Sequence, residues 1–490
     1  MRTPYFIAII SYLGLLIVVG AVLTRRVRTG TDFMVAGRRL PLAVMIGTLV
    51  ATWIGTGSIM GNAGLAWRNG FSALWAPLGG ALGILVVYFL AARARRFEGV
   101  TVPDILEARY HPSARILATI VTVTAYTVIT SYQFRAGGRV LNLVTGMSVD
   151  SGIIITAVFV IAYTALAGML SVAYTDLING IIMMVGLLIV LPIIVGQAGG
   201  WGAIRTNLGP EFFAAHNGEV QTLGGLNVML PGMLLLMGES NMFGRFFSAR
   251  SAGVARRAVA GWIIGVTILE VVVIAIGVAG RSLYPNLAEL YPGVANASEV
   301  VIPHMILTSV HPLIGVVLVA ALAAVIVSTA DSFLLTPATN IVNDVWKRFF
   351  DPDLAGRREV RILRMVVIAL GIWAYIQVRF FPNVLQAALY AYTMYGAAIT
   401  PAVLAAFFWK RAGVAAGVAS IATGMVVTLL WKWQIQPALN PEGMGLFDAV
   451  IPAMVASVSV LVIVSLLTSP PTPEKWAPFY RTADPDAVET

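Results

Sequence analysis

The sequence contains no cysteine, little charge and few histidines. Its 490 residues include no Cys and four His, and 11% of them are Asp, Glu, Lys or Arg. The absence of cysteine excludes disulfides, thiol catalysis and cysteine-based metal sites. None of the four histidines, at positions 111, 216, 304 and 311, has a neighbour at metal-ligand spacing. With no Ser-His-acid arrangement either, we do not expect an enzyme.

Long apolar runs dominate what is present. Hydrophobic residues make up 58% of the chain, and the charged fraction is less than half of the roughly 25% found in soluble domains. A helix that crosses a bilayer needs about 20 apolar residues, and such runs recur along the chain. We therefore expect an all-α integral membrane protein with one transmembrane domain, residues 1–468, in the cell membrane. The tail 469–490 is rich in Pro and polar residues and is expected to be disordered.

The apolar runs predict about thirteen transmembrane helices. Most of the 32 Lys and Arg residues fall in the loops on one side, among them Arg25, Arg95, Arg245 and Arg348. Because basic loops stay in the cytoplasm, we expect the N-terminus outside and the C-terminus inside. The net charge of +9 is then explained by topology and does not indicate nucleic-acid binding. The expected spans are 5–24, 43–66, 71–92, 116–143, 151–170, 172–196, 225–246, 258–280, 313–336, 362–380, 384–409, 413–431 and 446–467.

Two of these spans contain helix-breaking residues. The span 43–66 carries four glycines from Gly55 to Gly64, and the span 225–246 is interrupted by Pro231, Gly232, Gly238 and Gly244. A glycine inside a helix costs about 1 kcal/mol relative to alanine, so either small residues allow close helix packing or the helices are broken and line a cavity. Broken helices at matching positions in two five-helix halves are typical of inverted-repeat transporters. The halves would be 43–196 and 225–409, flanked by an extra N-terminal helix at 5–24 and C-terminal helices at 413–467.

Polar side chains inside the span 313–336 predict a cation site. Ser328, Asp331 and Ser332 lie at i, i+3 and i+4 and share one helix face, and Thr329 is adjacent. Hard cations take oxygen ligands. Hydroxyls could instead bond back to their own helix, but Asp331 has no such alternative, and a charge within the membrane costs about 2.5–3.5 kcal/mol.

Other intramembrane groups leave alternatives open. Asp176 could cap a helix, pair with a cytoplasmic arginine, or join the Ser328–Ser332 cluster. Arg135 could reach outward to water or bind an anionic group of a solute, and Glu239 could hold a cation or a proton. Glu270 has no visible partner in the sequence. The residues near the two breaks, where aromatic rings could pack or stack on a solute, give the candidate solute site: Trp53, Gly55, Ser58, Arg135, Glu239, Asn241 and Phe243.

Four stretches of the chain resemble the sodium:solute symporter family. They are "DFMVAGRRLP" with "ATWIGTGSIMGNAGLAWRNG", "LAGMLSVAYTDLI", "NMFGRFFSARSAGVARRA" and "AAVIVSTADSFLL" with "NIVNDVW". The resemblance implies the LeuT-like fold, an inverted repeat of five plus five helices. It also implies one Na⁺ ion held by Ala51, Ile54, Val325, Ser328 and Thr329. A second Na⁺ ion, which some members bind, would lie at Asp176, Ser328, Asp331 and Ser332.

The resemblance further implies a secondary active transporter. Inward sodium flux would drive uptake of a small organic solute by alternating access, with sodium, the solute and the lipid bilayer as partners. No obligatory protein partner is expected. Arg135 and Glu239 together would suit an amino acid or another zwitterion, and Arg135 alone a carboxylate. The alternatives are proton coupling, a choline-type or sugar-type symporter of the same fold, a passive channel, or a membrane sensor.

Overall fold

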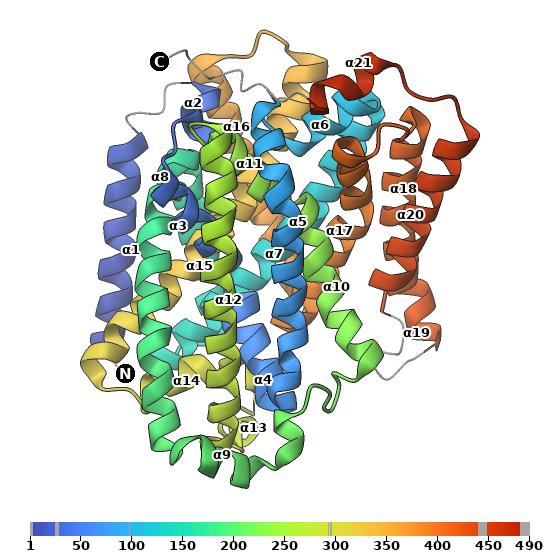
Figure 1. The fold of residues 1–490 in the computed structure, drawn as a ribbon. Coiled ribbons are helices and arrows are strands. Elements are labelled where there is room, and N and C mark those ends of the chain that lie inside the picture. The colour runs from blue at the N-terminus through green and yellow to red at the C-terminus, as the bar shows by residue number, and fades with distance from the viewer. Residues whose placement is uncertain are drawn as a thin grey trace.

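The computed structural model describes residues 3–24, 29–97, 99–292, 294, 296–439 and 448–480. These residues form a bundle of long helices, with α1 (Thr3–Thr24) at one edge and α18 (Val414–Leu430) and α20 (Val450–Leu467) at the opposite edge (Figure 1). Each of the thirteen expected spans falls on helical segments, as far as the chain is described. By length and composition, ten helices of the described chain could cross a membrane.

The first half of the core begins with an interrupted helix. Its successive segments are α3 (Leu42–Trp53), which continues as η2 (Gly57–Asn62) and α4 (Ala63–Asn69); α5 (Trp75–Arg96); α7 (Pro112–Thr145); and α8 (Val149–Gln197). The helix α8 supplies two segments because the backbone leaves helical geometry at Gly168, with φ 72° and ψ 169°. A positive φ costs glycine nothing, so Gly168 allows the chain to bend between the two expected spans.

The second half repeats this arrangement. It begins with another interrupted helix, α10 (Thr222–Gly238) and α11 (Ser240–Ser248), followed by α12 (Ala252–Leu283), α15 (Pro312–Asn340), α16 (Gly356–Gln377) and α17 (Val384–Phe408). The two interrupted helices each start a set of five segments. Short helices connect the long ones: α2 (Gly30–Val35), α6 (Val102–Arg109), α9 (Gly200–Leu208), α13 (Leu287–Leu290), α14 (Val301–Thr308), α19 (Gln436–Leu439) and α21 (Pro473–Trp476).

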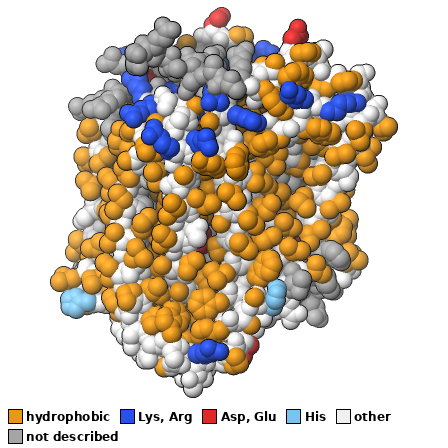
Figure 2. All heavy atoms as spheres, viewed as in Figure 1, with side chains coloured by type: hydrophobic (Ala, Val, Ile, Leu, Met, Phe, Trp, Pro, Cys, Tyr) orange, Lys and Arg blue, Asp and Glu red, His pale blue; other side chains and the backbone are white. Residues whose placement is uncertain are grey.

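The surface is banded in the way that a bilayer requires. Hydrophobic side chains cover the middle of the face shown in Figure 2, and most of its Lys and Arg side chains gather at the end of the bundle where α5 finishes at Arg96. The helix α1 begins at the opposite end (Figure 1). The basic residues are therefore segregated along the bundle axis, which is the asymmetry from which the orientation was inferred.

Residues 473–480 differ from the disordered tail expected for 469–490. They form α21 and a 3₁₀ turn, Ala477–Tyr480. Phe479 is 2% exposed and its ring stacks on Phe97 with centroids 5.3 Å apart. The aromatic residues in this part of the tail give it an apolar contact that its proline content did not suggest. Residues 481–490 lie outside the described chain.

Candidate functional site

The first interrupted helix exposes main-chain carbonyls at the centre of the bundle. The helix α3 ends at Trp53, and Ile54 leaves helical geometry with ψ 79°. The N–H of Gly55 then donates to the carbonyl of Trp53 at 2.9 Å, and so the Ala51 carbonyl loses the bond that Gly55 would give it in a continuous helix. A Cβ at position 55 would lie 2.8 Å from Oγ1 of Thr329. Glycine therefore permits the break to approach α15 closely.

The α15 side of this contact carries the expected hydroxyls. Ser328 and Thr329 are each 2% exposed, and Val325 one turn earlier is 1% exposed. Ser328 Oγ donates to Oδ1 of Asp176. Thr329 Oγ1 is buried without a hydrogen-bond partner in the described chain. An unsatisfied buried hydroxyl is costly, so an oxygen left free beside unwound carbonyls fits the chemistry of a bound cation.

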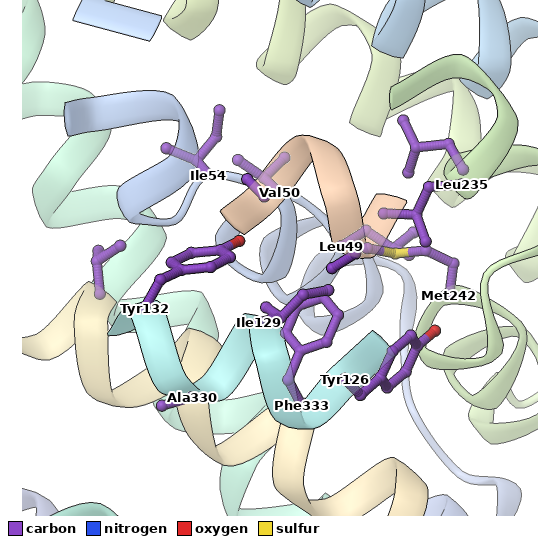
Figure 3. Close-up of a cluster of buried hydrophobic side chains, with 14 of the residues drawn as sticks. Leu49, Val50, Ile54, Tyr126, Ile129, Tyr132, Leu235, Met242, Ala330 and Phe333 are labelled. Atoms are coloured by element: carbon purple, nitrogen blue, oxygen red, sulfur yellow. The ribbon is translucent and has the colours of Figure 1, made fainter. Parts of the chain in front are cut away.

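Buried apolar side chains lie around the end of α3. Figure 3 shows Val50 and Ile54 at the end of α3 with Tyr132 of α7 and Ala330 of α15 nearby. Of the residues near the expected first ion, the break at Gly55 and the Thr329 side chain approach each other closely. The site of five residues, Ala51, Ile54, Val325, Ser328 and Thr329, stays a prediction.

Four residues are expected at a second ion. Asp331 and Ser332 lie further along α15, Ser328 is shared with the first site, and Asp176 lies on α8. Asp176 Oδ2 accepts from Thr48 at 2.6 Å and from Arg245 Nη2 at 3.1 Å. Arg245 Nη2 also donates to Ser332 Oγ at 2.9 Å. Asp331 is 1% exposed, and its Oδ2 has no hydrogen-bond partner in the described residues. The structure therefore brings Asp176, Ser328, Asp331 and Ser332 together, with a guanidinium among them.

Arg245 lies inside the bundle, whereas the sequence predicted that it lies in a cytoplasmic loop. It lies on α11 and is completely buried. The charge pattern alone could not distinguish it from the arginines that follow at 250, 256 and 257. Asp176 consequently takes two of the roles that were left open, since it pairs with an arginine and also joins the hydroxyl cluster.

Two of the solute candidates line a cavity beside the first break. Trp53 and Ser58 share this cavity with Asn62, Gly232 and Tyr392. The ring of Tyr392 lies against that of Trp53, with centroids 5.8 Å apart. The cavity has a volume of about 30 Å³, enough for roughly two water molecules. This conformation therefore closes around the space between the broken helices.

The other solute candidates lie elsewhere. Gly55 faces Thr329, and Arg135 Nη2 donates to the carbonyl of Val378 at 2.5 Å. Asn241 Oδ1 accepts from Thr336 at 2.7 Å and from Arg245. Phe243 packs among Phe246, Phe247 and Phe407. Glu239 is buried at the start of α11, and neither of its carboxylate oxygens has a hydrogen-bond partner in the described chain.

Glu270 is a residue whose place the sequence did not explain. It lies on α12 and is 1% exposed. Its Oε1 accepts from Ser58 Oγ at 2.5 Å, and its Oε2 accepts from Asn62 Nδ2 at 3.0 Å. Both donors belong to η2 and line the cavity at Trp53. An acidic residue in an otherwise apolar span was the only signal for this position.

Salt bridges connect separate segments of the chain near both ends of the bundle. At the basic end, Arg115 contacts Asp104, Glu107 and Asp344. Partial burial raises the pKa of the Glu107 carboxyl, but hydrogen bonds from Arg348 and Arg115 outweigh this effect and the pKa is lowered.

At the opposite end, Arg139 pairs with Glu299, whose carboxylate also accepts from the N–H groups of Val384 at 3.3 Å and Leu385 at 3.1 Å. Salt bridges thus join separate helices at the two ends of the bundle.

Comparison with known proteins identifies the family. The model of the sodium:solute symporter family matches residues 33–424. The chain belongs to the sodium:solute symporter family. It is 28% identical over 488 residues to a sodium/proline symporter of Staphylococcus aureus (strain bovine RF122 / ET3-1), covering 95% of this chain and 93% of the relative.

Solved structures show the same fold. A Na⁺-coupled sialic acid symporter in a substrate-bound outward-open state matches with a TM-score of 0.79 and 18% identity, over 95% of this chain and 98% of that one. MhsT in complex with L-phenylalanine matches with a TM-score of 0.59 and 14% identity, over 86% and 98%. The expected LeuT-like architecture is confirmed. The protein is a multi-pass protein of the plasma membrane, and sodium is the ion coupled to its solute transport.

Proposed function

We propose that this symporter takes up a small zwitterionic solute by alternating access, with its first sodium ion bound between α3 and α15. The ligands are the carbonyls of Ala51, Ile54 and Val325 and the hydroxyls of Ser328 and Thr329. The observation that carries this assignment is the buried Thr329 hydroxyl without a partner, which faces the break in α3. The N-terminus lies outside and the basic end of the bundle in the cytoplasm, following the distribution of Lys and Arg.

Sodium at this junction connects the two halves of the core. The helix α3 belongs to the first half and α15 to the second. A cation that shares ligands from both holds the break in one geometry, and its departure releases α15 from the break. Solute bound next to the break then experiences the same rearrangement, which couples the two fluxes.

The solute occupies the cavity at Trp53 and Ser58. Because this cavity now has room for only about two water molecules, binding requires the wall formed by α10 and α17 to move. We expect the salt bridges at the two ends of the bundle to break in turn, one in each open state. Arg139–Glu299 would part in the outward-open state and the Arg115 cluster in the inward-open state.

The number of sodium ions determines how far the solute can be concentrated. A membrane potential of 100 mV contributes about 2.3 kcal/mol per ion, and a tenfold sodium gradient adds about 1.4 kcal/mol. One ion then sustains roughly 500-fold accumulation, and two sustain roughly 10⁵-fold. We propose that a second ion binds at Asp176, Ser328, Asp331 and Ser332 only when Arg245 withdraws from Asp176.

Reconstitution tests the proposal. Purified protein in proteoliposomes should accumulate L-proline, or another amino acid from a panel, when an inward sodium gradient is imposed. Replacement of sodium by potassium, with or without an inward proton gradient, should abolish accumulation. Counterflow of labelled solute should be present, whereas a channel would show none. Uptake driven equally well by a proton gradient alone would contradict sodium coupling at this junction.

A further inference from the structure

We propose that Glu270 recognises a positively charged nitrogen of the transported solute. This inference rests on the proposed function, because it concerns the solute cavity beside the first break. It narrows the solute to ammonium compounds, whether zwitterions or simple cations, and it assigns a role to a carboxylate that the sodium junction does not use.

The position of Glu270 places its charge at the wall of the solute cavity. Its two oxygens accept from Ser58 and Asn62, and both of these side chains line the cavity at Trp53. Glu270 itself lines a second cavity of about 580 Å³, together with Phe71, Trp75 and Phe213. Pro77 lines both cavities. The carboxylate therefore lies between the closed solute cavity and a larger aromatic space.

The second cavity lies toward the end of the bundle that we assign to the outside. Its lining residues include Trp75, Leu78 and Ala81 in the first two turns of α5, opposite the basic end at Arg96. A solute that approaches from this side would meet the Glu270 carboxylate before it reached the sodium junction.

The charge of Glu270 lacks the ion pair that the buried acids Asp176 and Glu299 have. Asp176 pairs with Arg245 and Glu299 pairs with Arg139, whereas no Lys or Arg forms an ion pair with Glu270 within the described ranges. A buried carboxylate is costly unless a cation or metal balances it. Two neutral donors orient the group but supply no positive charge, so a ligand cation would complete the site.

The aromatic residues of the cavity suit the same chemistry. The rings of Trp53 and Tyr392 lie against each other in the wall of this cavity. Cations are attracted to the electron-rich faces of Trp and Tyr rings. None of the residues that line this cavity is Lys or Arg. The charge and the rings together favour an ammonium group over a carboxylate at this position.

A simpler role for Glu270 is to tie η2 to α12 through its two hydrogen bonds. That role requires an acceptor oxygen but no charge and predicts no preference among solutes. A glutamine at position 270 keeps one acceptor oxygen and the side-chain length and removes the charge. The two roles therefore differ in whether selectivity for charged solutes changes.

The test is a thermal-shift titration of the purified protein in nanodiscs, with 150 mM NaCl or 150 mM KCl. The probes are choline, its neutral isostere 3,3-dimethyl-1-butanol, L-proline and propionate. We expect choline or L-proline to stabilise the wild-type protein in NaCl, and the isostere and propionate to have no effect.

Glu270→Gln should lower the affinity for the ammonium probe by about 30-fold or more. This is the loss expected when one partner of a buried charge pair is removed. The exposed Glu289→Gln on α13 makes the same change in net charge and should respond like wild type.

Each outcome decides a separate question. Equal responses to choline and its isostere, or no response to either ammonium probe, would overturn the role of Glu270 without any reliance on a variant. An unchanged ammonium affinity in Glu270→Gln would do the same. Loss of the sodium requirement in the wild type, with selectivity for the ammonium probe retained, would instead refute the sodium coupling and leave the role of Glu270 intact.

Discussion

Removal of the Thr329 hydroxyl should separate the stability of the protein from its affinity for sodium. Thr329→Val keeps the shape of the side chain and deletes an oxygen that is buried without a partner in the described chain. An unsatisfied buried polar group costs about 1–3 kcal/mol. In the absence of sodium the variant should therefore melt at the same temperature as the wild type or higher.

The same substitution should weaken sodium binding strongly. Hydrogen bonds to charged groups contribute about 1.5–3 kcal/mol, and we apply this range to an oxygen that coordinates Na⁺. The sodium concentration for half-maximal stabilisation should then rise by roughly 10-fold to 150-fold, since about 1.4 kcal/mol corresponds to a factor of ten.

Melting curves in nanodiscs across a sodium series measure both effects. Thr130→Val is a matched control, because Thr130 is also fully buried but its hydroxyl donates to the carbonyl of Tyr126 in its own helix at 3.0 Å. The control should keep the wild-type response to sodium. A Thr329→Val protein with unchanged sodium affinity would refute the assignment of this hydroxyl as a ligand. A large loss of stability without sodium would show that the hydroxyl has a structural partner.

Three further predictions concern the charged groups. Asp176→Asn should lower the free energy of unfolding by about 3–5 kcal/mol because it leaves the buried Arg245 unpaired. The double variant Asp176→Asn with Arg245→Met should recover most of that loss, and chemical denaturation compares the two variants. Arg139→Met should favour the outward-open state, because it breaks the salt bridge at the outer end. A cysteine introduced at Leu389, in a chain with no native cysteine, should then react faster with a membrane-impermeant thiol reagent. Arg135→Gln should retain sodium-driven uptake and lower stability by about 1–3 kcal/mol, because Arg135 holds a backbone carbonyl outside the solute cavity.

The outcomes that would contradict these predictions are distinct. A double variant at 176 and 245 that is no more stable than the single variant would mean that the ion pair is not what Asp176→Asn disturbs. Unchanged labelling of the cysteine would place the Arg139 contact outside the opening transition. Selective loss of carboxylate solutes in Arg135→Gln, with stability retained, would restore Arg135 to the solute site.

The architecture could be predicted from the sequence because its signals are local. Apolar runs of membrane length mark the helices, and the residues that interrupt α3 and α10, such as Gly55 and Glu239, stand at or beside the observed breaks. The cluster at Ser328 to Ser332 could be located because helix periodicity puts its members on one face. Each of these inferences needs only the residues of one segment.

The partners of single charged residues could not be predicted in this way. Arg245 resembles a loop arginine in sequence and is instead buried against Asp176, 69 positions away. Glu270 meets Ser58, 212 positions away. Arg135 Nη2 donates to a main-chain carbonyl, and such a contact leaves no trace in the side-chain pattern. These contacts depend on how the two halves pack, and one segment of sequence does not encode that packing.

The most direct test of the account is a pair of high-resolution cryo-EM maps, one recorded in NaCl and one in N-methylglucamine chloride. The sodium assignment predicts a density peak between Ala51, Ile54, Val325, Ser328 and Thr329 that is present in the first map and absent from the second. An uninterrupted α3, or a junction that lacks this peak at saturating sodium, would contradict it.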